Sequence, residues 1–123
     1  MHILVVDDEA NIRFAYKEIL SSVGYQVISA KNGQEAEKCL QDNLVDLIVT
    51  DLIMQNGDGI ELAVFARSLQ NRPKILAVTG GGARISAHNA LAMGEHFFDA
   101  ALTKPVSDDA LLTTINHLLS TQH

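Results

Sequence analysis

The sequence predicts an α/β domain built around a parallel β-sheet. Short apolar runs of strand length alternate along the chain with amphipathic stretches of about 10 to 15 residues, which is the pattern of repeated strand–helix–strand units. In addition, most of the apolar runs end in a side chain that can bind a metal ion or a phosphate. In open sheets of this kind, ligands bind in the crevice outside the carboxyl ends of the strands.

The apolar runs have the length and composition of short buried strands. Val27 and Ile28 mark the second strand in chain order. The other four runs, each with the polar group that follows it, are residues 3–6 with Asp7 and Asp8, residues 47–50 with Asp51, residues 75–78 with Thr79, and residues 102–103 with Lys104.

Apolar residues at helical spacing predict the helices between these strands. Gly24 is expected to end the first helix, and Ser107 can cap the last. Residues 84–93 are expected to form a short helix, which brings the count to five strands and five helices. The apolar positions of the other four helices are Ile12, Ala15, Ile19, Leu20 and Val23; Ala36 and Leu40; Leu62, Phe65, Ala66 and Leu69; and Leu111, Ile115 and Leu118.

Length and composition indicate one globular domain over residues 1–123, either a complete protein or one domain of a larger one. Apolar residues make up 47% of the chain and charged residues 20%, unlike a disordered protein. No apolar run approaches the roughly 20 residues that span a bilayer, and the start lacks the features of a signal peptide. We therefore expect a cytoplasmic location without membrane contact, and the lone Cys39, which cannot form an internal disulfide, agrees with it.

The net charge of −6 argues against nucleic acid as a partner of this domain, because nucleic-acid binding selects clustered Lys and Arg. The histidines show no metal-ligand spacing. The glycines at 80–82 lack the Gly-Lys-Ser/Thr that completes a phosphate-binding P-loop.

Asp7, Asp8 and Asp51 are expected to converge at one edge of the sheet. If the strands that carry them are neighbours, about 4.8 Å apart, three carboxylates meet there. A hard divalent cation relieves their mutual repulsion, and an oxygen-only ligand set favours Mg²⁺ or Mn²⁺ over zinc. A carboxylate beside Mg²⁺ can attack a phosphoryl group and form an aspartyl phosphate.

The remaining strand ends offer the partners that a phosphoryl group needs. Lys104 supplies positive charge, while the Thr79 hydroxyl and the backbone N–H of Gly80 supply hydrogen-bond donors. Taken singly, each residue has an ordinary explanation, because Asp at a strand end usually belongs to a turn and Lys-Pro is common in loops. Their coincidence at successive strand ends favours one phosphoryl site.

These residues, in this order, resemble the receiver domain of two-component response regulators, the CheY-like family. The resemblance covers essentially the whole chain. It implies a doubly wound, flavodoxin-like (βα)5 fold, with a five-stranded parallel sheet of order 2-1-3-4-5 and helices on both faces. The segments that carry it are Val5-Val6-Asp7-Asp8-Glu9, Asp51 with Met54 and Asp58-Gly59, Thr79-Gly80, and Lys104-Pro105.

By matching position, the resemblance implies that Asp51 is the phosphoryl acceptor. Asp7, Asp8 and Asp51 would bind Mg²⁺ or Mn²⁺ together with the main-chain carbonyl of Ile53. The phosphoryl donor would be a phosphohistidine on a sensor histidine kinase or a phosphotransfer protein.

The same resemblance makes Thr79 the switch hydroxyl and Lys104 the phosphate partner, with the N–H of Gly80 as a further donor to the phosphoryl group. The Lys104-Pro105 peptide bond would be cis.

The chain departs from the family's pattern in three places. The family usually has Pro four residues after the acceptor, where this chain has Gln55, and an aromatic three residues before the Lys, where it has Ala101. That aromatic swings inward with the Thr on phosphorylation, so we expect a muted response at the fifth strand. Phe97 and Phe98 are the candidates to fill its place, within an atypical segment 94–98.

The leading function is a phosphorylation-dependent signalling switch, with no enzymatic activity beyond self-phosphorylation and self-dephosphorylation. It would bind a downstream protein through its last two helices and fifth strand, as a monomer or weak dimer. One alternative is a Mg²⁺-dependent phosphohydrolase with an Asp nucleophile, but Ile53 stands where such enzymes generally carry an acid/base carboxylate. Another is a degenerate receiver that only binds partners.

Overall fold

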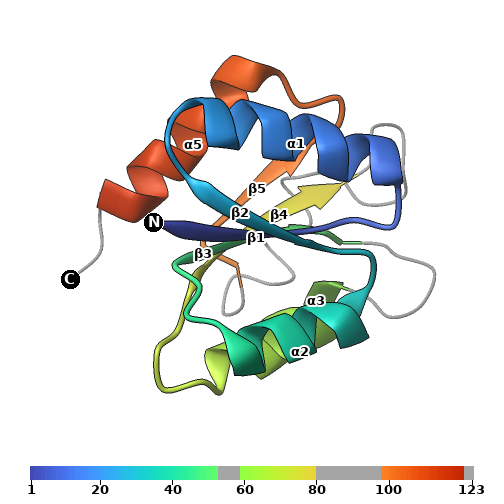
Figure 1. The fold of residues 1–123 in the computed structure, drawn as a ribbon, viewed down its shortest axis with the longest axis vertical. Coiled ribbons are helices and arrows are strands. Elements are labelled where there is room, and N and C mark those ends of the chain that lie inside the picture. Colours follow the sequence, from blue (N-terminus) through green and yellow to red (C-terminus); the bar gives the residue numbers. More distant parts are fainter. Residues whose placement is uncertain (53–58, 80–97, 121–123) are drawn as a thin grey trace.

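The computed structural model describes residues 1–52, 59–79 and 98–120 and shows a five-stranded sheet between two layers of helices (Figure 1). The strand order is β2-β1-β3-β4-β5, and every neighbouring pair is parallel, so the predicted class and topology are confirmed. The expected helix at 84–93 lies outside the described residues. The elements are β1 (His2–Val6), α1 (Ala10–Ser22), β2 (Gln26–Ala30), α2 (Gly33–Asp42), β3 (Leu47–Asp51), α3 (Gly59–Arg67), β4 (Lys74–Thr79), β5 (Ala100–Thr103) and α5 (Asp108–Ser120).

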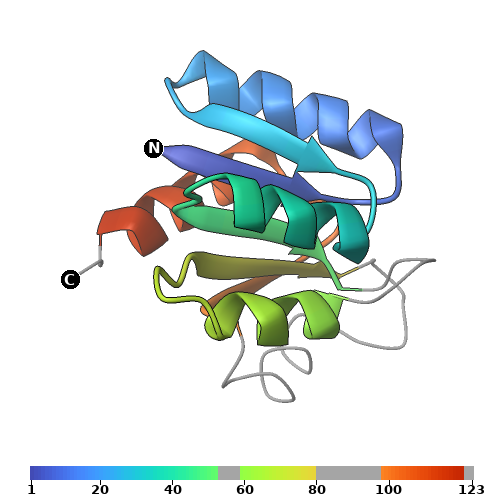
Figure 2. The ribbon, with the colours of Figure 1, turned by 60° about the horizontal axis from the view of Figure 1, so that its bottom comes forward.

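The central strands of the sheet are buried on both faces, as β1 illustrates. Ile3 and Val5 belong to the apolar layer under α1 and α5, whereas Leu4 and Val6 belong to the layer under α2 and α3. Successive side chains of a strand point to opposite faces, so both layers draw on the same strand. Figure 2 shows α2 and α3 side by side on the second face. A strand covered on both faces needs a continuous apolar run, which is the pattern of β1, β3 and β4.

The strand register aligns the carboxyl ends of β1, β3 and β4. Val6 of β1 lies opposite Thr50 of β3, and Asp51 of β3 lies opposite Val78 of β4. The residues that follow β1 and end β3 and β4 therefore meet at one edge of the sheet.

Helix ends follow the expected capping chemistry. The Asn32 side chain accepts a hydrogen bond from the Glu35 N–H at the start of α2, at 2.8 Å. Ser107 caps α5 as predicted, since its hydroxyl accepts from the Ala110 N–H at 3.1 Å. Gly24, two residues after α1, has a φ of 99°, a conformation that glycine adopts without strain.

Some elements differ from their sequence-based prediction. β2 is longer than the Val27–Ile28 core that marks it, because this edge strand is half-exposed and contains the polar residues Gln26 and Ser29. Cys39 of α2 is partly buried and packs against the α2/α3 layer. Phe98 is a core residue, 4% exposed, and Phe97 lies outside the described residues.

Among the helices that the structure describes, none has the length and apolar character that crossing a membrane requires.

Candidate functional site

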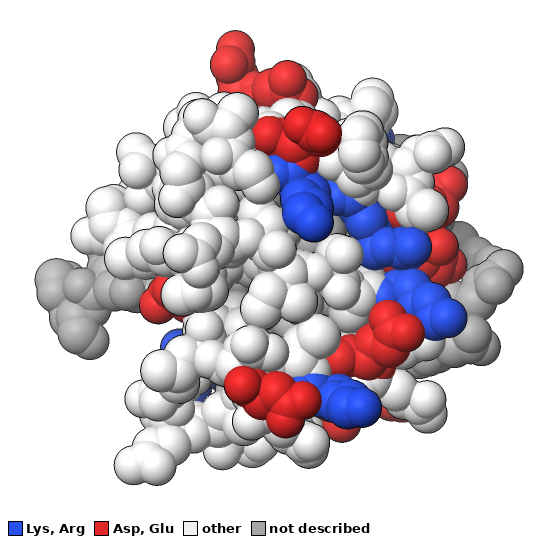
Figure 3. Space-filling view, viewed as in Figure 1, with Lys and Arg blue, Asp and Glu red and all other residues white. Residues whose placement is uncertain are grey.

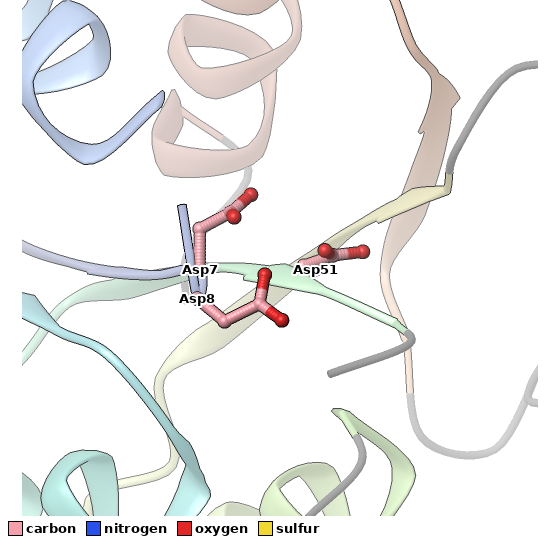
Figure 4. A group of neighbouring side chains, drawn as sticks. All are labelled: Asp7, Asp8 and Asp51. Carbon is pink, nitrogen blue, oxygen red and sulfur yellow. The ribbon is translucent and has the colours of Figure 1, made fainter. Parts of the chain in front are cut away.

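Three carboxylates meet at the carboxyl edge of the sheet, as the sequence predicts. Ligand oxygens of Asp7, Asp8 and Asp51 all lie within 4.8 Å of one another (Figure 4). Asp7 and Asp8 follow β1, and Asp51 ends the neighbouring β3. Asp7 is 2% exposed and Asp51 8%, whereas Asp8 is exposed. Anions held this close repel one another strongly in a partly buried site, so the cluster needs a cationic partner.

Lys104 brings a positive charge to this cluster. Its Nζ lies 2.9 Å from Asp7 Oδ2, 3.4 Å from Asp51 Oδ2 and 3.8 Å from Glu9 Oε2. Burial alone lowers the pKa of Lys104, but the hydrogen bond to Asp7 and the charges of Asp51 and Asp7 outweigh burial and raise it above its ordinary value. Lys104 therefore stays charged. The Lys104-Pro105 bond is cis, as the resemblance implies.

The loop after β1 holds Asp7 from several sides. The Asp7 N–H donates to the Ala30 carbonyl at 3.2 Å, and Asp7 Oδ1 accepts from the Glu9 N–H at 2.9 Å. Arg13 Nη1 donates to the Asp7 carbonyl at 2.6 Å, which ties α1 to the end of β1. The sequence gives no signal for this role of Arg13, because spacing along the chain does not show how α1 sits over the strand end.

Thr79 contributes a buried hydroxyl to this edge of the sheet. The residue is 0% exposed, and its Oγ1 has no hydrogen bond to any described residue. Leaving a buried hydroxyl unpaired costs about 1–3 kcal/mol, so such a group calls for an explanation. The predicted phosphoryl partner Gly80 and metal ligand Ile53 lie outside the described residues.

Tyr16 is a further residue at the site that sequence reasoning missed, because it stands at helical spacing in α1 and looks like a core position. It is 7% exposed and belongs to the apolar layer under α1 and α5. It also lines a groove of about 530 Å³ with Lys104 and Pro105. Burial raises the pKa of its phenol; the charge of Lys104 lowers it, and those of Asp7 and Asp51 raise it further.

The model of the family described as "Response regulator receiver domain" matches residues 3–116. The chain belongs to this family. The receiver domain is 34% identical over 118 residues to the transcriptional regulatory protein GlrR of Escherichia coli K12, and 35% identical over 115 residues to the sensor histidine kinase RcsC of Salmonella typhi. These matches cover 96% and 94% of this chain but only 26% and 12% of the two relatives, so the chain spans a small part of their length.

Solved receiver structures share the fold closely. The response regulator TrrA of Thermotoga maritima, determined in complex with Mg²⁺-BeF, superposes with a TM-score of 0.82 at 33% identity, covering 96% of this chain and 98% of that one. A CheY-like receiver domain protein of Methanospirillum hungatei gives 0.86 at 30% identity, covering 97% and 93%. The acidic trio of this receiver is consistent with the Mg²⁺ site of such domains.

Proposed function

We propose that this receiver is a phosphorylation-dependent signalling switch that accepts a phosphoryl group on Asp51 and thereby changes its binding to a protein partner. One observation carries the proposal. The Asp51 carboxylate lies within 4.8 Å of those of Asp7 and Asp8 and 3.4 Å from the Lys104 ammonium. A nucleophilic carboxylate, a hard-cation site and a fixed positive charge are the groups that phosphoryl transfer requires.

The donor set of the site fits Mg²⁺ or Mn²⁺. Asp7, Asp8 and Asp51 offer only oxygen ligands, and the two buried carboxylates are held in place by β1 and β3. When bound, the metal ion neutralises charge on the carboxylates and on the phosphoryl oxygens. The Mg²⁺-BeF complex of TrrA, at 33% identity, supports this choice of ligand. The main-chain carbonyl of Ile53 is proposed as a further ligand.

The chain's own residues would perform the transfer as follows. An oxygen of Asp51 attacks phosphorus, the new O–P bond forms, and the P–N bond of a phosphohistidine breaks with its electron pair left on the imidazole. Lys104 pairs with the phosphoryl oxygens as their charge develops. The unpartnered Thr79 hydroxyl then has an acceptor, beside the N–H of Gly80.

The partners follow from the family in general terms. Receiver domains work with histidine kinases and are typically not enzymes themselves. The match to RcsC, a sensor histidine kinase, agrees with a kinase or phosphotransfer donor for this chain. The downstream partner is expected to be a protein, as in a switch whose surface changes on phosphorylation.

The proposal is tested with acetyl phosphate as a small donor. Intact mass should increase by one phosphoryl group in the presence of Mg²⁺ or Mn²⁺ and not in excess chelator. Asp51→Asn should abolish the increase. Asp42→Asn is the matched control, because Asp42 is exposed at the end of α2 and lies outside the acidic trio. An unchanged mass increase in Asp51→Asn would show that another residue is the acceptor.

A further inference from the structure

Lys104 has a flexible side chain, but its ammonium is held near two carboxylates. Its four-carbon stem loses rotamer freedom when it is fixed, yet the ammonium pairs with both Asp7 and Asp51. Its side chain is 17% exposed, so most of its length lies against protein.

Lys104 lines a groove together with residues of α1. Its wall on the helix side comes from α1, with Ile12, Tyr16 and Ile19, and its other wall is formed by Lys104 and the segment that follows. Among these α1 residues, Tyr16 has the largest side chain and is 7% exposed. A tyrosine in such a place has a rigid ring anchored in the core and a polar tip that tolerates the edge of a charged site.

We propose that Tyr16 is a positioning residue for Lys104: its ring closes the groove and keeps the Lys104 ammonium directed at Asp7 and Asp51. The part of this inference that concerns the phosphoryl group rests on the proposed function. The part that concerns the ion pairs does not. The phenol remains neutral, because burial raises its pKa, so its effect on Lys104 is that of a wall and not of a charge.

Holding Lys104 at the carboxylates should weaken metal binding but speed phosphoryl transfer. Lys104 occupies the carboxylates that a divalent cation would use, so it competes with the cation. It is also the cation that pairs with the phosphoryl group. Loosening Lys104 should therefore tighten Mg²⁺ binding and slow phosphorylation. General damage to the fold would weaken both.

The test uses Tyr16→Leu, which keeps an apolar side chain in the core but removes the ring. We expect the Mg²⁺ dissociation constant, measured by calorimetry, to fall about threefold, and the acetyl phosphate reaction at saturating Mg²⁺ to slow about fivefold. Tyr16→Phe restores the ring and should return both values to within about twofold of the parent. Tyr25→Leu, at the other tyrosine of the same apolar layer, should show neither effect.

A double-mutant cycle separates positioning from packing. In a Lys104→Met background, Tyr16→Leu should leave the Mg²⁺ affinity unchanged, because the side chain it positions is gone. Weaker Mg²⁺ binding in Tyr16→Leu, or an effect that persists without Lys104, would overturn the inference. If the parent took no phosphoryl group, the proposed function would fail, but the Mg²⁺ measurements would still decide the role of Tyr16.

Discussion

Within the described residues, the buried polar side chains are Asp7, Thr50, Asp51 and Thr79. Asp7 and Asp51 share the Lys104 ammonium, and the Thr50 hydroxyl donates to the Asp51 carbonyl at 3.0 Å. Thr79 differs, because its hydroxyl has no partner within that part of the chain. A group that costs stability in the resting protein is a candidate to gain a partner in the phosphorylated one.

Replacing Thr79 by Val is therefore expected to stabilise the resting protein by about 1 kcal/mol, since the unpaired hydroxyl is removed at nearly constant shape. Thr50→Val is the matched control and should lose about 1 kcal/mol, because its hydroxyl is hydrogen-bonded. Urea unfolding of both variants measures the difference. Equal losses of stability would mean that the Thr79 hydroxyl is satisfied in solution.

At the scale of the elements, β5 is short, partly exposed and unusual in its packing. Ala101 lies opposite Ala77 of β4, and both belong to the α2/α3 layer that contains the buried Phe98. Because all three side chains belong to one layer, we expect Phe98 to occupy volume that an aromatic at position 101 would otherwise need. The fifth strand then has no aromatic side chain to swing.

This packing predicts the result of restoring an aromatic. Ala101→Tyr alone should destabilise the protein by about 2 kcal/mol through overpacking. Ala101→Tyr combined with Phe98→Ala should recover much of that loss, whereas Phe98→Ala alone should cost about 3 kcal/mol through its cavity. Chemical denaturation of the three variants gives the coupling energy. Additive losses would show that the two side chains use separate space.

The elements also show which features a sequence can predict. Central strands are covered on both faces and appear in the sequence as apolar runs, so β1, β3 and β4 can be predicted from the sequence. The half-exposed β2 has apolar residues mainly in its middle, so only that part can be predicted. Strand-end residues are predictable as a site because parallel strands share one edge. Tyr16 and Arg13 are not, because their roles depend on how α1 packs over that edge.

For the molecule as a whole, the clustered carboxylates of Asp7, Asp8 and Asp51 concentrate negative charge at one edge of the sheet. On the face shown in Figure 3, basic side chains lie next to acidic ones. The net charge of −6 adds to the repulsion within the trio, which Lys104 only partly offsets.

Thermal melts should reveal this repulsion. Mg²⁺ is expected to raise the melting temperature of the parent, because it binds the folded state alone. Asp8→Asn should raise it by about 4 °C without metal, corresponding to about 1 kcal/mol of relieved repulsion, and should reduce the response to Mg²⁺. Asp42→Asn removes the same charge outside the trio and should do neither. If Mg²⁺ left the melting temperature of the parent unchanged, this result would argue against a metal site.

The position of Tyr16 also gives the protein an optical property. The chain has no Trp and two Tyr, so its intrinsic ultraviolet fluorescence comes from Tyr16 and Tyr25. Tyr16 lies within the electric field of Asp7, Asp51 and Lys104, whereas Tyr25 lines a different groove with Val23 and residues of α5. In a Tyr25→Phe background, one fluorophore would remain, and its emission would report each change of charge at the acidic trio without any added label.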